Sequence, residues 1–285
     1  VSGAADGYAR ISGKPAITLL HLGPGYANSM ANLHNARRAN SAIVNIVGDH
    51  AVWHHQHDAP LTSDVEAHVK IHSHWFKTTT SAEDLSLVGA EAVAASLSGP
   101  GKIATLVVPA NHAWEASSKS FDRILPVPLD MVSDERLEIT KRLLSNGKRT
   151  GLLLGGNALR EQNLSYAGRI ASATGATLLS ETFPARLQRG EGRVPVNRVP
   201  YFAEQAIDFL DEYKQLILIG APAPVAFFAY PGVKSTLYSD DCLIEEFASA
   251  DDDVDHALER LSESFPNTGG FAVQEYEVPE VVTQS

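Results

Sequence analysis

Short uninterrupted apolar runs alternate with segments of helical periodicity along this chain, and this alternation constrains the fold more than any other feature. The runs AITLLHL, AIVNIVG and IATLVVP occupy residues 16–22, 42–48 and 103–109. Continuous apolar runs of this length are typical of strands buried on both faces of a parallel sheet. Apolar residues recur at helical spacing over 27–36 and 85–97. Strands alternating with helices predict a doubly wound parallel sheet with helices on both faces.

The same alternation starts again in the second half, so the sequence predicts two α/β domains. The first spans 1–115, and 116–133 is a linker because it mixes polar residues with two prolines. The second spans 134–265, and 266–285 forms a mobile tail without periodicity. In the second domain we predict helices over 137–144, 159–173, 202–210 and 251–261 and strands over 150–156, 176–181, 216–220 and 235–239.

The first residues fit the end of a helix. Residues 4–10 precede Gly13, a plausible C-terminal cap, and Pro15 prevents the helix from continuing. The following GPG, residues 23–25, is expected to form a turn between the first strand and the next helix.

Charge and cysteine content exclude several classes of function. The formal net charge of −11 argues against a nucleic-acid-binding surface and against attraction to anionic membranes. Cys242 is the only cysteine, so no intrachain disulfide can form, and a reducing, cytoplasmic location is expected. The longest apolar run, 216–230, is interrupted by Gly220 and two prolines and is too short to span a bilayer.

The strand-turn-helix around LLHLGPGYANS is the first candidate site. His21 ends a predicted strand, and ligands bind beyond the carboxyl ends of strands in open parallel sheets. Gly23 and Gly25 allow close backbone approach, and Asn28 is predicted in the first turn of the following helix. The alternative is a tight turn whose histidine is hydrogen-bonded to backbone.

A histidine-rich loop, GDHAVWHHQHDAPLTSD, is the second candidate. It holds His50, His54, His55 and His57 close to Asp58. These side chains favour either proton transfer or a transition-metal site, and the third interpretation is a polar surface loop. We assign no metal ligand, because no motif such as H-E-x-x-H is present.

Two glycine-containing stretches in the second domain are weaker candidates. LLLGGNALRE could cradle a phosphate or nucleotide, and RLQRGEGR could meet an anionic cofactor. The G-x-G-x-x-G pattern is absent, so a close strand-to-helix connection and a solvated loop are the alternatives.

Three segments together resemble one family. GAADGYARISGKPA, HLGPGYANSMANLHNARRANSAIVNIVGDH and GKIATLVVPAN are similar to the pyrimidine-binding domain of thiamine diphosphate-dependent enzymes. This group includes acetolactate synthase, pyruvate oxidase and benzoylformate decarboxylase. Residues 149–239 resemble the Rossmann-like middle domain of the same enzymes. The resemblance implies an acetolactate synthase-like enzyme that decarboxylates a 2-oxo acid or transfers the product to an acceptor.

The resemblance also implies roles for individual residues. His21 matches the position of an active-site histidine in benzoylformate decarboxylase, where acetolactate synthase-like members have a small hydroxyl residue. It would be the catalytic proton-transfer group, and Gly23, Gly25 and Asn28 would shape the cofactor's pyrimidine pocket. The adjacent histidines of the second candidate loop resemble the paired histidines of pyruvate decarboxylase. Pro60 stands with its neighbour Leu61 where acetolactate synthase has Phe-Gln.

The family's cofactors are thiamine diphosphate and Mg²⁺, with FAD left open. Its activating glutamate would fall before Val1, and its G-D-G motif for Mg²⁺ and the diphosphate is absent. We therefore expect an incomplete chain that is inactive in isolation. The expected partners are a 2-oxo acid and further copies of the chain, in a homodimer or tetramer, without nucleic acid or membrane. The alternative is a non-catalytic binding or assembly subunit with the same fold.

Overall fold

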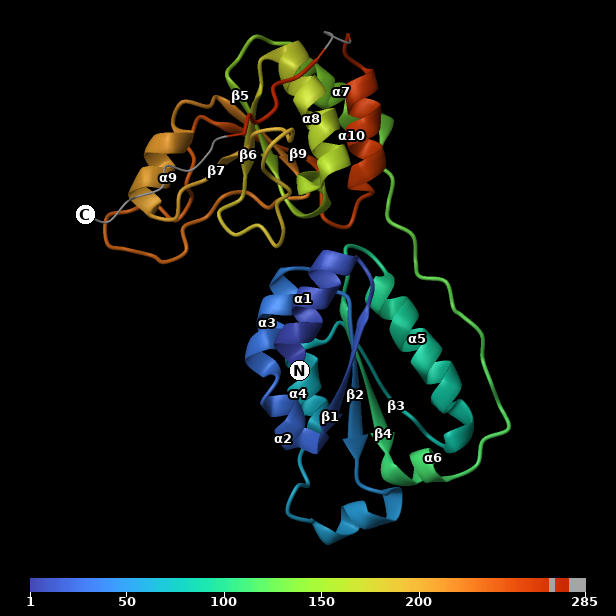
Figure 1. Cartoon of the computed structure of the whole chain (residues 1–285). Helices are drawn as coiled ribbons and strands as arrows, with labels where there is room; N and C mark the ends of the chain where they lie inside the picture. The colour runs from blue at the N-terminus through green and yellow to red at the C-terminus, as the bar shows by residue number, and fades with distance from the viewer. Residues whose placement is uncertain (267–269, 277–285) are drawn as a thin grey trace, which may run out of the picture. The chain divides into compact units, whose positions relative to one another are not determined.

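The computed structural model describes residues 1–266 and 270–276, and it divides into two compact units (Figure 1). The first unit is Val1–Leu129 and the second is Asp130–Ser285. The division falls inside the segment predicted as a linker. Both units are parallel sheets flanked by helices, which confirms the predicted α/β fold class.

The first unit is built on a four-stranded parallel sheet in the order β1-β2-β4-β3. Its strands are β1 (Ala16–His21), β2 (Ile43–Asp49), β3 (Trp75–Thr78) and β4 (Ile103–Pro109). Its helices are α1 (Ser2–Ser12), α2 (Leu22–Ala27), α3 (Met30–Arg38), η1 (Val52–His57), α4 (Val65–His72), η2 (Ala82–Asp84), α5 (Leu85–Leu97) and α6 (Ala110–Trp114). Figure 1 shows α1 to α4 on one face of the sheet and α5 on the other.

The beginning of the chain is fixed by a polar contact between α1 and the turn after α3. Arg10 donates from Nε and Nη2 to the Asp6 carboxylate at 2.8 and 2.6 Å, and Ser41 Oγ donates to Asp6 Oδ1 at 2.5 Å. Gly13 ends α1 with φ 66°, and its N–H bonds to the Ala9 carbonyl, so the predicted cap is confirmed. The bond from Ser41 to Asp6 therefore links α1 to the turn after α3, and Arg10 of the same helix pairs with the Asp6 carboxylate within the ADGYAR motif, residues 5–10.

The expectation that the first strand is buried on both faces is wrong. Ile17 and Leu19 are 63% and 73% exposed, while Ala16, Thr18 and Leu20 are buried. β1 lies at the edge of the sheet, and α5 packs on β4 with its neighbours rather than on β1. An apolar run alone cannot separate a central strand from an edge strand with one covered face.

The second unit has a five-stranded parallel sheet in the order β7-β6-β5-β8-β9. Its strands are β5 (Thr150–Leu154), β6 (Thr177–Ser180), β7 (Asn197–Arg198), β8 (Gln215–Ile219) and β9 (Leu243–Ala248). Its helices are α7 (Asp134–Leu144), η3 (Gly156–Leu159), α8 (Glu161–Thr174), α9 (Ala203–Leu210) and α10 (Val254–Glu263). Figure 1 places α7, α8 and α10 on one face and α9 on the other, which is a doubly wound arrangement.

One predicted strand of this unit is wrong. Within 235–239 only Thr236 pairs, in an isolated bridge with Val225. The strand beside β8 is instead β9, which the sequence analysis missed because Glu245 and Glu246 interrupt its apolar residues. α10 begins later than predicted, with Asp253 as N-cap accepting from the His256 N–H at 3.0 Å.

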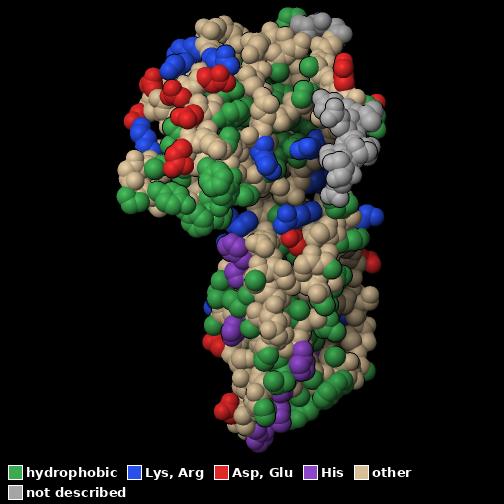
Figure 2. Space-filling model, turned by 60° about the vertical axis from the view of Figure 1, so that its left-hand side comes forward, with side chains coloured by type: hydrophobic (Ala, Val, Ile, Leu, Met, Phe, Trp, Pro, Cys, Tyr) green, Lys and Arg blue, Asp and Glu red, His purple; other side chains and the backbone are tan. Residues whose placement is uncertain are grey.

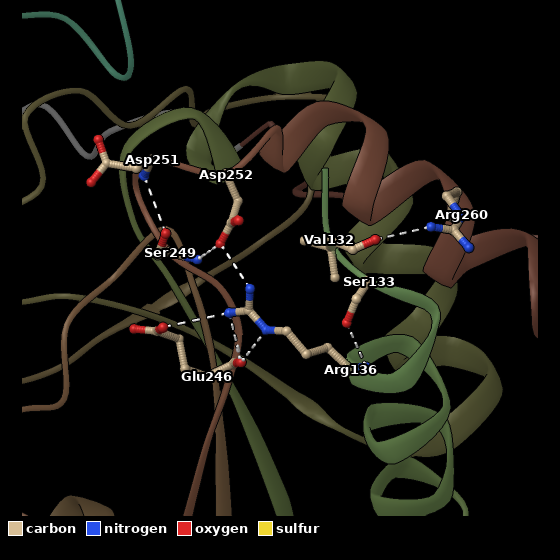
Figure 3. A network of polar contacts seen from close by, with 8 residues as sticks. All are labelled: Val132, Ser133, Arg136, Glu246, Ser249, Asp251, Asp252 and Arg260. Carbon is tan, nitrogen blue, oxygen red and sulfur yellow. Dashed lines mark hydrogen bonds and ion pairs between the residues drawn. The ribbon is translucent and has the colours of Figure 1, made fainter. Parts of the chain in front are cut away.

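An arginine-centred network joins α7 to β9 and the segment before α10 (Figure 3). Arg136 donates to the Glu246 carbonyl from Nε and Nη2 at 3.2 and 3.0 Å and from Nη1 to Asp252 Oδ2 at 3.1 Å. The Ser249 N–H donates to the same Asp252 oxygen at 2.6 Å. The network fastens the edge strand to the first helix of the unit.

Part of the predicted tail is bonded to the second unit. The Gln274 N–H donates to the Arg193 carbonyl at 2.8 Å, and the Gly192 N–H donates to the Gln274 carbonyl at 2.9 Å. Ser172 Oγ donates to the Gly270 carbonyl at 3.0 Å. The rest of the predicted tail, 267–269 and 277–285, lies outside the described residues. In the part of the chain that is described, no helix is long and apolar enough to cross a membrane.

Candidate functional site

The predicted site residues lie at the carboxyl end of β1, but the local structure differs from the expectation. GPG does not form a turn, because Leu22–Ala27 is the short helix α2 with Pro24 in its first turn, where proline's missing N–H costs nothing. The chain reverses at Leu22, whose φ of 53° is uncommon for a residue with a side chain. His21 is the N-cap of α2, and its side chain is exposed.

Asn28 does not lie in the first turn of a helix, as expected, but is the C-cap of α2. With a rise of about 1.5 Å per residue, the seven steps along α2 separate Asn28 from His21 by roughly 10 Å. These two predicted site residues therefore stand at opposite ends of one short helix, with Gly23 and Gly25 between them.

Gly23 is in close contact with a loop that follows β2. A Cβ atom at Gly23 would lie 1.8 Å from Ser63 Oγ, and one at Gly25 would lie 3.3 Å from the Leu20 carbonyl carbon. Any side chain at Gly23 would displace the loop around Ser63. Glycine is required at this position because Ser63 approaches so closely, whereas the expected approach of a ligand to Gly23 and Gly25 stays a prediction.

A hollow of about 240 Å³ lies beside this contact. Its lining combines apolar side chains, two hydroxyl groups and one imidazole, from Gly23, Pro24, Ala27, Pro60, Leu61, Thr62, Ser63 and His68. Thr62 and Ser63 belong to the second candidate loop and His68 follows it, but nothing in their spacing predicts that they lie beside α2. A hollow with apolar walls and a few polar groups has the composition of a small-molecule site.

The histidine-rich loop leaves the carboxyl end of β2, next to β1 in the sheet. His55 Nε2 lies 3.2 Å from Asp49 Oδ2, and the rings of His50 and His54 are 5.1 Å apart. Among the described residues, His50 Nε2 is buried without a hydrogen-bond partner. Asn111, at the end of β4, accepts from the Val52 N–H at 3.0 Å and so ties the loop to the sheet.

No metal centre is preformed in this loop. Over residues 1–266 and 270–276, no group of three or more His, Cys, Asp or Glu side chains converges as metal ligands would. The histidines of this loop are arranged as neighbouring rings rather than as a ligand set. Figure 2 shows histidine side chains distributed along one face of the first unit.

A polar network crosses the sheet behind α2. Thr18 donates to Asn45 at 2.7 Å, Asn45 donates to Thr105 at 3.2 Å, and the Thr105 and Ser73 hydroxyls are 2.6 Å apart. The Tyr26 hydroxyl of α2 reaches Ser73 at 3.4 Å, and burial raises the pKa of Tyr26. The network anchors α2 to three strands.

In the second unit, the glycine turn after β5 packs against the turn after β8. A Cβ atom at Gly155 would lie 2.5 Å from the Gly220 carbonyl oxygen, so the two strand ends meet backbone to backbone. Burial lowers the pKa of the Arg160 guanidinium, and the nearby charge of Arg186 lowers it further. In the described part of the chain, Arg160 Nη1 is buried without a hydrogen-bond partner. This pair of arginines fits an anionic group.

Known proteins are similar to this chain in sequence and in fold. Residues 1–72 match the family model of the thiamine pyrophosphate enzyme N-terminal TPP binding domain. Over 273 residues the chain is 43% identical to a Mycobacterium tuberculosis protein described as a "putative acetolactate synthase large subunit", a match covering 94% of the chain and 51% of the relative. Over 185 residues it is 30% identical to chloroplastic acetolactate synthase of Arabidopsis thaliana, covering 62% of the chain and 27% of that protein.

Solved structures share the fold at low sequence identity. The thiamine diphosphate-dependent 4-hydroxybenzoylformate decarboxylase of Rhodococcus jostii superposes with a TM-score of 0.78 at 17% identity, covering 100% of this chain and 57% of that one. Benzoylformate decarboxylase of Polynucleobacter necessarius gives 0.77 at 17% identity, covering 93% and 52%. The chain is therefore similar to thiamine diphosphate-dependent enzymes over most of its sequence, and it spans about half the length of the curated relative that it matches over 273 residues.

Proposed function

We propose that this chain supplies the pyrimidine-binding and middle domains of a thiamine diphosphate-dependent 2-oxo acid decarboxylase or carboligase. The observation that carries the proposal is the placement of His21 at the carboxyl end of β1, at the start of the helix whose Gly23 borders the hollow. The relatives and the matching family model support the same cofactor class.

In this proposal, α2 contributes to cofactor binding and His21, its N-cap, transfers a proton. The pyrimidine ring would lie against the backbone of Gly23 and Gly25, and Asn28 offers an amide at the far end of α2. The lack of a side chain at Gly23 also leaves room for Ser63 at the edge of the hollow. Thiamine diphosphate supplies the electron sink that lets a 2-oxo acid lose carbon dioxide. The His21 imidazole is exposed and can act as a general acid, so it can deliver the proton that replaces the departing carboxylate.

Mg²⁺ belongs to the complete enzyme in this proposal. The described residues offer no converging set of three or more ligands, and the Mycobacterium tuberculosis relative is about twice as long as this chain. We assign the metal and diphosphate contacts to the half of such relatives that the chain does not match. If FAD binds, Arg160 and Arg186 would hold its diphosphate, because a buried guanidinium nitrogen there needs an acceptor.

The substrate is a 2-oxo acid, and the active form is a homodimer or tetramer. Pro60 and Leu61 give the hollow an apolar wall, which suits the side chain of a 2-oxo acid, while its carboxylate would remain toward His21. After carbon dioxide leaves, the remaining part of the 2-oxo acid can take one of two routes. Its protonation would make the protein a decarboxylase, and its addition to an acceptor carbonyl would make it a carboligase.

Cofactor binding and turnover test the proposal separately. Titration calorimetry of the 285-residue chain with thiamine diphosphate should give weak one-site binding, which His21→Ala retains. The product of the whole coding region should release carbon dioxide from a panel of aliphatic and aromatic 2-oxo acids. Loss of a general acid should slow that release about 10²- to 10⁴-fold in the His21→Ala variant.

Each outcome of these two experiments distinguishes among the proposed enzyme, a non-catalytic subunit and neither. Unchanged turnover in His21→Ala would remove the histidine from the mechanism. Thiamine diphosphate binding without turnover of any 2-oxo acid would favour the non-catalytic binding or assembly subunit. Absence of both binding and turnover would refute the proposed function.

A further inference from the structure

A second hollow, of about 110 Å³, lies within the second unit, and the proposed function does not use it. Three segments that are far apart in the sequence line it: the first turns of α8, residues 192–194 and residues 271–273. Its apolar walls come from Leu164, Val194, Phe271 and Val273. A cavity of about 150 Å³ holds a benzene molecule, so this hollow has room for a molecule of about four carbon atoms.

Backbone hydrogen bonds fix the segment that carries Phe271 against the rest of the unit. The Gln274 N–H donates to the Arg193 carbonyl at 2.8 Å, and the Gly192 N–H donates to the Gln274 carbonyl at 2.9 Å. The Phe271 ring packs on α8, where a Cβ atom at Gly168 would lie 3.1 Å from it. The hollow is therefore a feature of the folded unit, with its walls held by hydrogen bonds and by core packing.

Arg193 brings an unused hydrogen-bond donor to the hollow. Of the side-chain atoms that the structure describes, its Nε is one that is buried without a hydrogen-bond partner. The guanidinium is held in place through Nη2, which lies 3.0 Å from Glu161 Oε2. A buried N–H without an acceptor costs stability, and the donors of a guanidinium form a fork that matches a carboxylate. Arg193 Nε therefore suits an acceptor that the described part of the chain does not supply.

The charges around Arg193 favour an anion. Residues 186–193, RLQRGEGR, include three arginines and one glutamate, whereas the whole chain has a formal net charge of −11. Glu161 is the acid that lines the hollow, and its ion pair with Arg193 balances its charge. Arg160, the N-cap of α8, adds a further guanidinium next to Glu161 in the sequence. A positive patch on an acidic protein concentrates small anions.

We propose that this hollow binds a short aliphatic carboxylate, with its charged group at Arg193 and its hydrocarbon chain against the apolar walls. One carboxylate oxygen would accept from Arg193 Nε, which supplies the partner that this atom lacks. The hydrocarbon chain would lie among Leu164, Val194 and Phe271, as apolar parts of ligands do in small-molecule sites. Inorganic phosphate or sulfate would match the charge but would leave the apolar walls uncovered.

NMR titration of the 285-residue chain tests the inference, with acetate, butyrate and 2-oxobutyrate as probes. Two resonances report on the hollow, the Arg193 Nε–H and the Gly192 backbone amide. Butyrate should shift both in a saturable way, with a dissociation constant in the millimolar range. The two CH₂ groups that acetate lacks should improve the affinity of butyrate about tenfold. Tighter binding of 2-oxobutyrate would identify a 2-oxo acid as the preferred ligand, and equal binding would identify short carboxylates in general.

Three variants separate the Nε contact from other effects of Arg193. Arg193→Lys keeps a positive charge but removes the forked donors, so the Gly192 amide should report butyrate affinity weakened about tenfold or more. Glu161→Gln is the matched control, because it breaks the same ion pair while Nε stays in place, and binding should be retained. Arg149→Lys, at an exposed ion pair with Glu212, should leave the affinity unchanged.

The absence of a saturable shift with all three probes overturns the inference. So does equal affinity for acetate and butyrate, because the apolar walls would then play no part. A folded Arg193→Lys variant with the wild-type affinity overturns it as well. The titration needs neither thiamine diphosphate nor turnover, and both reporting groups belong to the second unit. Its failure therefore leaves the proposed function standing, and failure of cofactor binding or turnover leaves this inference standing.

Discussion

Gly23 and Ser63 approach so closely that a Cβ atom on Gly23 would lie 1.8 Å from the Ser63 hydroxyl oxygen and 2.6 Å from the Ser63 Cβ. The contact joins α2 to the loop before α4, and both residues line the hollow. The shape of the candidate site therefore depends on the absence of one side chain.

Gly23→Ala should push the loop outward and distort the hollow. Overpacking of this kind costs about 1–3 kcal/mol of stability, and we expect affinity for thiamine diphosphate to fall as well. Urea unfolding and calorimetry measure the two effects. Gly7→Ala is the matched control, because nothing lies within 4 Å of its Cβ position in α1, and alanine there should stabilise the helix by up to about 1 kcal/mol.

A double variant tests the contact between Gly23 and Ser63 directly. Gly23→Ala combined with Ser63→Gly removes the clashing atoms, so the double variant should recover much of the lost stability. Losses that simply add would show that the contact does not carry the effect.

Asp6 should be important for the stability of the first unit. Asp6→Asn removes the charge that Arg10 and Ser41 share, and hydrogen bonds to charged groups contribute about 1.5–3 kcal/mol each when the groups are shielded from water. The control is Glu66→Gln, which breaks the exposed pair with Lys70 and should change the urea midpoint little. Equal effects of the two substitutions would contradict a structural role for the ADGYAR motif.

Much of the fold follows from the sequence where apolar runs are buried on both sides. β4 occupies 103–109 and is buried along its whole length, and α5 has the predicted bounds 85–97. Both elements lie where helix and sheet pack on each other, so sequence pattern and burial agree. β9 was missed because an edge strand tolerates Glu245 and Glu246, which breaks the apolar pattern.

The candidate site was only partly predictable. His21 and the glycines are recognisable from local pattern, since a strand end and a glycine each have a direct structural meaning. The Gly23–Ser63 contact and the place of His68 in the hollow depend on packing between segments about 40 residues apart. Asn28 was misplaced because α2 begins directly after β1, and a helix containing Gly-Pro-Gly has low propensity in isolation.

The stability of the first unit should decrease in mildly acidic solution because of His72. Burial lowers the pKa of this imidazole, and the neighbouring His34 and Arg37 lower it further. The unfolded chain, with the ordinary value near 6.5, then binds the proton more readily than the folded chain does. Stability is therefore complete above about pH 6.5 and is lost as the pH falls below it.

Chemical denaturation between pH 8 and 5 measures this dependence. His72→Gln should flatten the slope below pH 6.5 even if it lowers stability at pH 8, where the imidazole is neutral in both states. A variant with the wild-type slope would show that another group is responsible.

Asp252 should make the second unit sensitive to stronger acid. Burial raises the pKa of this carboxyl, but the Ser249 hydrogen bonds and the charge of Arg136 outweigh burial and hold the pKa below its ordinary value. A folded-state pKa below the unfolded one stabilises the protein above about pH 4, and this contribution is lost as the pH falls through the folded value. Asp252→Asn should therefore lower stability at pH 7 by about 1–3 kcal/mol and reduce the loss between pH 4 and 2.

Arg136→Met should remove part of the same contribution, and the two losses should not add, because each substitution breaks the 3.1 Å ion pair. Urea unfolding can be followed by the fluorescence of Tyr213, which is buried in the second unit. The same measurement on a Tyr213→Phe variant identifies the part of the signal that comes from Tyr213. An unchanged acid slope in Asp252→Asn would mean that the network in Figure 3 positions the chain without contributing to its pH dependence.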